Sequence, residues 1–132
     1  MGACLDSWAI LAWLDGDEPA AGAVQEVFEV ERPWMSWLNL GEVAYQVERC
    51  HGATEASVVI RRLRAALALD DVSPRRVLAA ARVKAEHAIA FADCFAIATA
   101  TALDATLLTG DPEILERNVG CRTRDLRPRD AG

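Results

Sequence analysis

The sequence has few of the residues that build zinc sites or disulfide scaffolds. Its 132 residues include only 4 cysteines and 2 histidines, and no two cysteines form a Cys-x-x-Cys pair. This scatter argues against a zinc ribbon and against a small disulfide-stabilised domain. Cys50-His51 could supply half of a zinc site, but the sequence has no second pair to complete four ligands. We therefore expect reduced, buried thiols.

An excess of basic residues is also missing, since the formal net charge is -6. A protein that coats nucleic acid neutralises phosphates with a basic surface, so the charge argues against that class. It does not exclude nucleic acid as a substrate. Acids that bind a metal differ from acids spread over a solvated surface, and the positions of the carboxylates therefore decide the interpretation.

Long apolar runs are absent as well. No basic-then-apolar leader opens the sequence, and the longest near-apolar stretch, residues 88–103, is too short and interrupted to span a bilayer. We expect a cytoplasmic protein. The length fits a single domain over residues 1–132, with a core from about 3 to 122 and a frayed tail from about 124 to 132.

What the sequence does contain is an alternation of short apolar runs and helical patterns. Strands are predicted at residues 3–5, 34–38, 105–109 and 119–122. Helices are predicted at residues 8–14, 20–30, 39–51, 54–69, 74–86, in the second part of 88–103, and briefly from 110–113. This order predicts an α/β fold of three layers, α/β/α, around a short parallel sheet of about four or five strands.

Several acids fall at the predicted junctions between strands and helices. Asp6 and Asp111 each follow an apolar strand, where ligands bind in parallel sheets. Asp93 is the only charge in its apolar run, and a buried carboxylate is usually paired or bound to metal. Acids that converge in one crevice repel one another and so require a cation. Oxygen ligands favour Mg²⁺ or Mn²⁺ over Zn²⁺.

The same acids also have a structural explanation as helix caps. Asp6, Asp93 and Asp111 each precede a predicted helix and could accept hydrogen bonds from its first amides, with the helix after Asp93 beginning near Cys94. Asn39 and Glu42 have the spacing of a capping box. Taken singly, each acid fits this explanation better than a role as a ligand; the burial of Asp93 and the shared placement of the acids favour the metal site.

Four segments together resemble the acidic motifs of PIN-domain nucleases, and their order and spacing are most similar to VapC toxins of bacterial toxin–antitoxin pairs. The segments are Leu5-Asp6-Ser7, Asn39-Leu40-Gly41-Glu42, Ala92-Asp93-Cys94-Phe95-Ala96-Ile97-Ala98 and Leu108-Thr109-Gly110-Asp111. The resemblance extends from about Ala3 to Arg122. Each motif alone is common, so the ordered set carries the resemblance.

The resemblance implies a site and two supporting residues. The acidic tetrad would be Asp6, Glu42, Asp93 and Asp111, which would hold Mg²⁺ or Mn²⁺. Ser7 and Thr109 would orient ligands or water. Glu113 is a candidate fifth acid of the site, which we interpret more simply as a first-turn helix residue. Two departures from the family pattern are Cys94, where alanine is common, and Trp8, which is bulky for its place.

The resemblance also implies a function and partners. The protein would be a metal-dependent endoribonuclease toxin that hydrolyses RNA phosphodiester bonds, forms a homodimer, and is neutralised by a cognate VapB-like antitoxin. Four tryptophans are candidates for the antitoxin surface or, more simply, for the core: Trp8, Trp13, Trp34 and Trp37. Local contacts with RNA could come from arginines that we interpret chiefly as solvated: Arg61, Arg62, Arg64, Arg75, Arg76 and Arg82.

Two other functions fit parts of the sequence. A non-catalytic PIN-like binding module would use the acids as helix caps or to hold a structural ion. A haloacid-dehalogenase-like phosphatase would explain an early Asp and a late Gly-Asp, but Trp8 stands where that chemistry needs a second Asp. Cleavage of RNA, binding without cleavage, and turnover of a phosphomonoester distinguish the three.

Overall fold

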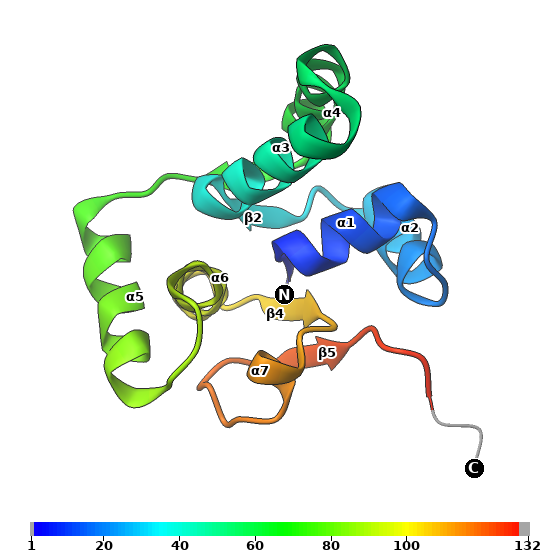
Figure 1. Cartoon of the computed structure of the whole chain (residues 1–132). Helices are drawn as coiled ribbons and strands as arrows, with labels where there is room; N and C mark the ends of the chain where they lie inside the picture. Colours follow the sequence, from blue (N-terminus) through cyan, green and yellow to red (C-terminus); the bar gives the residue numbers. More distant parts are fainter. Residues whose placement is uncertain (1, 130–132) are drawn as a thin grey trace.

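A parallel sheet forms the centre of the computed structural model, which describes residues 2–129 (Figure 1). Its strand order is β3-β2-β1-β4-β5, and every neighbouring pair is parallel. Within the described residues the strands are β1 (Ala3–Leu5), β2 (Trp34–Ser36), β3 (Ala68–Asp70), β4 (Thr106–Thr109) and β5 (Thr123–Asp125). The α/β class with a short parallel sheet is therefore confirmed.

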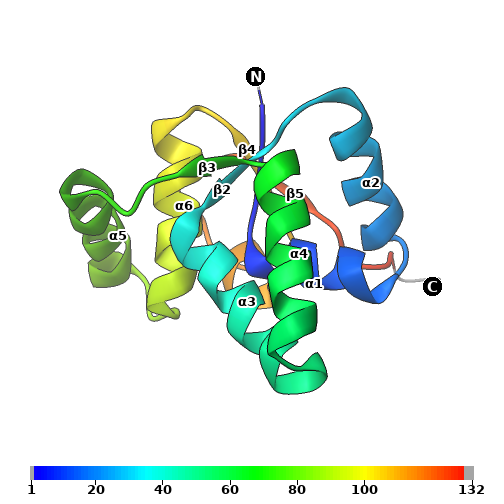
Figure 2. The same cartoon turned by 90° about the horizontal axis from the view of Figure 1, so that it is seen from above.

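Helices connect successive strands, as parallel pairing requires. In the described part of the chain they are α1 (Ser7–Asp15), α2 (Ala20–Val30), α3 (Trp37–His51), α4 (Ala53–Ala66), α5 (Pro74–Glu86), α6 (Phe91–Ala102) and α7 (Pro112–Leu115). Figure 2 shows α5 beside α6 at one end of the sheet and α3 beside α4 across one face. None of these helices is long and apolar enough to cross a membrane.

Two hydrophobic cores lie on the two faces of the sheet. Because side chains alternate along a strand, Ala3 and Leu5 of β1 pack with α1 to α4, whereas Cys4 packs with α5, α6 and α7. Leu108 and Leu107 of β4 divide between the same two cores. This arrangement gives the predicted three layers, with the sheet in the middle.

The strand β3 was missed by the sequence analysis, which extended the preceding helix to residue 69. The helix α4 ends at Ala66, and the next residue, Leu67, has extended backbone angles. The Arg32 guanidinium donates hydrogen bonds to the carbonyls of Leu67 (2.8 Å) and Arg64 (3.3 Å), which satisfies carbonyls at the end of the helix. Tertiary pairing of β3 with β2 thus overrides the helical pattern.

The last strand lies a few residues beyond its predicted position, at β5 rather than at 119–122. Val119 is buried in the loop that precedes it. After β5, the amide of Leu126 donates to the carbonyl of Thr109 (2.9 Å), and Leu126 is only 3% exposed. The segment up to Leu126 is therefore part of the packed fold, where a frayed tail was expected. Residues 130–132 of that tail lie outside the described residues.

The cysteines and, in the simpler interpretation, the tryptophans were expected to be buried, and the structure buries only some of them fully. All four cysteines are free thiols. Cys4 and Cys94 are buried, but Cys50 is exposed, so burial was wrongly expected for it. The four tryptophans pack against the edges of the two cores with part of each ring accessible: Trp8, Trp13, Trp34 and Trp37.

Candidate metal centre

Asp6 and Thr109 meet where the neighbouring strands β1 and β4 end. The register places Leu5 beside Leu108, so the next residues of the two strands lie side by side. Asp6 is 2% exposed and caps α1, because its Oδ1 accepts a hydrogen bond from the amide of Ala9 (2.9 Å). The Thr109 hydroxyl donates to the other oxygen of Asp6. The buried carboxylate is thus held at both oxygens.

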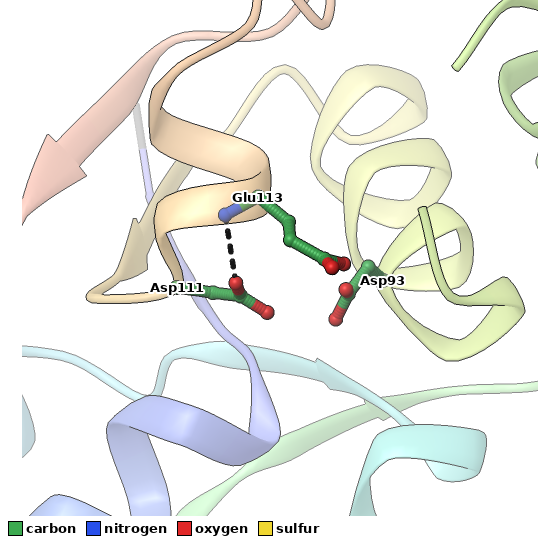
Figure 3. A group of neighbouring side chains, drawn as sticks. All are labelled: Asp93, Asp111 and Glu113. Atoms are coloured by element: carbon green, nitrogen blue, oxygen red, sulfur yellow. Dashed lines mark hydrogen bonds between the residues drawn. The ribbon is translucent and has the colours of Figure 1, made fainter. Parts of the chain in front are cut away.

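Thr109 also connects Asp6 to the next acid along the chain. The amide of Asp111 donates to the Thr109 hydroxyl oxygen (3.0 Å). Asp111 in turn caps α7, where its Oδ1 accepts a hydrogen bond from the amide of Glu113 (2.9 Å), as Figure 3 shows. Pro112 occupies the first position of that helix, where its missing N–H costs nothing. The turn after β4 therefore presents two carboxylates, those of Asp111 and Glu113.

A third carboxylate faces these two from another element. Asp93 lies in the first turn of α6, and Figure 3 shows its side chain directed toward Asp111 and Glu113. One carboxylate oxygen from each of the three residues lies within 4.8 Å of the others. We call Asp93, Asp111 and Glu113 the acidic cluster. It joins residues 18 and 20 positions apart along the chain, across the gap between α6 and α7.

The four acids of the predicted tetrad interact electrostatically, since the charges of Asp111, Asp6 and Glu42 all raise the pKa of Asp93. Asp93 and Asp111 come together, but Asp6 and Glu42 lie outside the acidic cluster, which contains Glu113 instead. Glu113 was predicted as a first-turn helix residue, with a fifth acid of the site as the alternative, and it does lie in the first turn of α7. Its spacing of two residues from Asp111 gave no signal, because residues two apart on a helix do not face each other. Ser7, the predicted supporting residue, is the first residue of α1 and is half-buried.

Two of the proposed capping roles were wrong. The cap of α3 is Ser36, whose hydroxyl accepts a hydrogen bond from the amide of Leu38 (3.2 Å), so Asn39 and Glu42 form no capping box. The helix α6 begins at Phe91 and has no side-chain cap, which leaves the Asp93 carboxylate uninvolved in capping. Asp6 and Asp111 do cap helices, each through Oδ1, and Oδ2 of Asp6 also accepts the hydrogen bond from Thr109.

Electrostatics within this group of acids oppose full ionisation. Burial raises the pKa of Asp6 to about 7, against the lowering effect of its hydrogen bonds with Thr109 and Ala9. Burial likewise raises the pKa of Asp93 to about 7, and the charge and hydrogen bond of Asp111 add to this effect. The charge of Glu42 acts on both groups in the same direction. These carboxylates therefore crowd negative charge into a poorly solvated region.

Within the described residues, no ion pair with a basic side chain compensates that charge. Among residues 2–129, the three ion pairs within 4.0 Å involve Asp70, Asp104 and Asp125, and none involves the acidic cluster, Asp6 or Glu42. Mg²⁺ and Mn²⁺ prefer carboxylate oxygens, and ligand oxygens around one such ion lie roughly 3 to 4 Å apart. The donor types and the 4.8 Å spacing of the acidic cluster fit such an ion.

Trp8 borders this site through an unusually close approach to Gly110. A methyl group at Gly110 would lie 2.1 Å from Cη2 of the Trp8 indole, a distance that atoms cannot adopt. Glycine is therefore required here by the space that the ring occupies. The bulky departure from the family pattern at Trp8 is accommodated by the glycine that precedes Asp111.

Fold and site together define an α/β protein with carboxylates gathered at the carboxyl edge of a parallel sheet. A family model described as the PIN domain matches residues 3–119. The chain belongs to the PIN domain family, and the predicted resemblance is confirmed. The phosphatase alternative is accordingly not supported. No curated protein matches the sequence.

Solved structures of similar fold cover nearly the whole chain. VapBC2 from Rickettsia felis, solved with a DNA fragment from its promoter, is 16% identical with a TM-score of 0.76, over 95% of this chain and 98% of that chain. VapBC from Salmonella typhimurium is 18% identical with a TM-score of 0.76, over 96% and 99%. VapC20 from Mycobacterium tuberculosis, described as a toxin that cleaves the sarcin-ricin loop, is 15% identical with a TM-score of 0.71, over 87% and 94%.

Proposed function

We propose that the protein is a metal-dependent endoribonuclease that hydrolyses RNA phosphodiester bonds as the toxin of a cytoplasmic toxin–antitoxin pair. The observation that carries the proposal is the acidic cluster, which lies uncompensated at the carboxyl edge of a PIN fold. Structures of similar fold include a toxin described as cleaving the sarcin-ricin loop, which supports RNA as the substrate class.

In this proposal Asp93, Asp111 and Glu113 hold Mg²⁺ or Mn²⁺, and Asp6 and Glu42 supply further negative charge beside it. A bound divalent ion polarises a phosphoryl oxygen and lowers the pKa of a bound water. Thr109 holds Asp6 and the backbone of Asp111 in fixed relation through its two hydrogen bonds. The amino-terminal end of α1, which Asp6 caps, adds a partial positive charge near the position of a phosphate.

Cleavage of a labelled RNA by protein purified free of any antitoxin tests the proposal. We expect cleavage with Mg²⁺ or Mn²⁺ and none after chelation. Glu113→Gln should reduce cleavage about tenfold or more. Glu116→Gln is the matched control, since Glu116 is an exposed acid that ends the same helix and lies outside the acidic cluster. RNA that is bound but never cut would favour the non-catalytic binding module.

The proposed partner is a VapB-like antitoxin. Several structures of similar fold are VapBC complexes, which supports this partner class. A groove of about 820 Å³ between α3 and α4, lined in part by Tyr45, Ile60 and Arg61, offers it an amphipathic surface. Co-expression with its cognate VapB-like antitoxin should yield a complex that does not cut RNA, and Ile60→Glu should weaken that complex.

A homodimer is the proposed assembly. Leu78 on α5 is 67% exposed and Phe91 at the start of α6 is 42% exposed, so each presents an apolar side chain to solvent. Light scattering of the purified chain should give the mass of two copies, and Leu78→Glu should shift it toward one. A monomeric wild type would contradict the homodimer without affecting the proposed nuclease.

Arginines give the RNA few obvious contacts. Arg76 pairs with Asp70, and Arg64 lies over the ring of Trp37, 5.2 Å from its centroid. The other four members of the predicted set are exposed: Arg61, Arg62, Arg75 and Arg82. We propose that these four remain the candidates for salt-dependent contact with RNA phosphates.

A further inference from the structure

A buried amide links two of the elements that carry the acids. Asn39 lies in the first turns of α3 and is 1% exposed. Its Nδ2 donates one hydrogen bond to Oε1 of Glu42 (3.0 Å), on the same helix, and another to the carbonyl of Ala92 (3.0 Å), on α6. Ala92 immediately precedes Asp93. One side chain thus holds both the Glu42 carboxylate and the backbone that carries Asp93.

The orientation of this amide is determined by its neighbours. Both partners of Nδ2 are acceptors, so the reversed amide would place its oxygen against two other oxygens. Nδ2 therefore serves two acceptors: the hydrogen bond to Glu42 lies within α3, and the one to Ala92 joins α3 to the first turn of α6, 53 positions away in the sequence.

The oxygen of the Asn39 amide reduces the stability of the fold. Among the described residues, the buried Oδ1 of Asn39 has no hydrogen-bond partner. A buried acceptor left without a partner reduces stability, and an apolar residue of similar volume avoids that cost. Stability alone therefore does not explain an asparagine at this position, whereas its two donors place two acids of the candidate site.

We propose that Asn39 is a positioning residue that holds Glu42 and the Asp93-bearing turn of α6 in register, so that the acids bind a divalent cation tightly. The inference rests on the metal-dependent function proposed above. Because Asn39 acts through other residues, its effect must depend on the group that it holds. Groups outside the first ligand sphere typically change metal affinity or activity 10- to 100-fold.

Calorimetric titration of Mn²⁺ into the antitoxin-free protein tests the inference without relying on activity. Asn39→Leu removes both donors and the unpartnered acceptor while filling a similar volume. We expect the thermal midpoint to change little and the Kd for Mn²⁺ to rise about tenfold. Thr99→Val is the control, since Thr99 is also buried and polar but its hydroxyl contacts Asp70 (3.5 Å), outside the acids of the site. That variant should bind Mn²⁺ as the wild type does.

A double-mutant cycle then asks whether Asn39 acts through Glu42. Glu42→Leu removes the acceptor of the Asn39 hydrogen bond. We expect the rise in Kd of Asn39→Leu combined with Glu42→Leu to be well below the product of the two single rises, because both substitutions remove the same contact. Unchanged Mn²⁺ affinity in a folded Asn39→Leu protein would overturn the inference while the proposed nuclease stands. Wild-type protein that neither binds Mn²⁺ nor cuts RNA would overturn the proposed function instead. Asn39→Ser, which also cannot reach both partners, decides the question if the leucine variant does not fold.

Discussion

Asp70 and Asp6 both lie at the carboxyl ends of strands of the sheet, β3 and β1, but their carboxylates have different partners. Asp70 is the last residue of β3, and its carboxylate pairs with the Arg76 guanidinium at 2.8 and 3.3 Å. Asp6 follows β1 directly, and among residues 2–129 it has no ion pair with a basic side chain. Burial raises the pKa of Asp6 to about 7.

Asp70 is a structural acid, whereas Asp6 lies beside the candidate metal ligands. At β3 the chain supplies its own cation, from the helix α5 that follows the strand. Where β1 and β4 end, the acidic cluster, Asp6 and Glu42 have no ion-pair partner among residues 2–129, so a cation from outside could balance their charge. Both acids lie at a strand end, but Asp70 pairs with Arg76, whereas Asp6 accepts hydrogen bonds from Ala9 and Thr109 and has no ion pair among residues 2–129.

The largest expected effect is the loss of RNA cleavage when the Asp93 carboxylate is replaced by an amide, compared with the same replacement at Asp70. Asp93→Asn should lower RNA cleavage about 100-fold or more, since even groups outside the first ligand sphere cost 10- to 100-fold. Asp70→Asn should leave cleavage within about threefold of wild type, because only the charge on Arg76 loses its partner. Initial cleavage rates at saturating Mn²⁺ measure both.

Circular dichroism melts of the two variants provide the control. The Asp93→Asn protein should fold at least as well as the metal-free wild type, since it removes a poorly solvated charge. A folded Asp93→Asn enzyme with full activity would show that the acidic cluster is not the site, and the comparison would then distinguish two structural acids.

A smaller effect is expected from removing the cation on the paired side. Arg76→Met leaves the Asp70 carboxylate, whose side chain is 14% exposed, without its strongest partner. We expect the free energy of unfolding to fall by about 1 to 3 kcal/mol, as for other polar groups left unsatisfied. Urea denaturation measures this change. Arg82→Met, an exposed arginine on the same helix, should change stability by less than about 0.5 kcal/mol.

The sequence predicted the parts of this comparison that depend on local pattern. An apolar strand followed by an acid identified Asp6 and Asp111, and an acid within an apolar run identified Asp93. It did not predict β3, since a three-residue strand has too little pattern to be distinguished from the end of a helix. That strand depends on pairing with β2 and on Arg32, which is 35 residues away from Leu67.

The site was predicted least well where it depends on how side chains meet. Membership of Glu113 depends on the direction in which the four-residue helix α7 turns its first residues toward α6. The role of Asn39 depends on a carbonyl 53 residues away. Neither relation leaves a periodic signal in the sequence, because both are fixed by packing between elements.

A third prediction concerns the close contact between Trp8 and Gly110, next to Asp111. Gly110→Ala forces the indole or the β4–α7 turn to move, and such overpacking typically costs about 1 to 3 kcal/mol. Because the displaced turn carries Asp111, we expect both a lower melting temperature and weaker Mn²⁺ binding. Trp8→Ala combined with Gly110→Ala removes the clash and should recover part of the Mn²⁺ affinity. If Mn²⁺ binding stays weak in the double variant, the contact between Trp8 and Gly110 does not control the position of Asp111.

The smallest expected effect is on the pH dependence of stability. The folded-state pKa of Asp6 and of Asp93 is about 7, against an ordinary value of 3.8, so the metal-free folded state binds protons that the unfolded state releases. Their contribution to stability is complete below about pH 4 and is lost as pH rises through about 7. The Arg127 guanidinium lowers the pKa of Asp125, so that group changes stability only at more acidic pH.

Melting curves between about pH 5 and about pH 8 measure this dependence. The metal-free protein should lose stability as the pH rises, and Mn²⁺ should raise the melting temperature more at pH 8 than at pH 5, because protons and the ion compete for the same carboxylates. Asp93→Asn should flatten both trends, whereas Asp70→Asn should preserve them. If both variants flatten the pH dependence equally, then the ion pair of Asp70 with Arg76 does not explain why the two acids respond differently to pH.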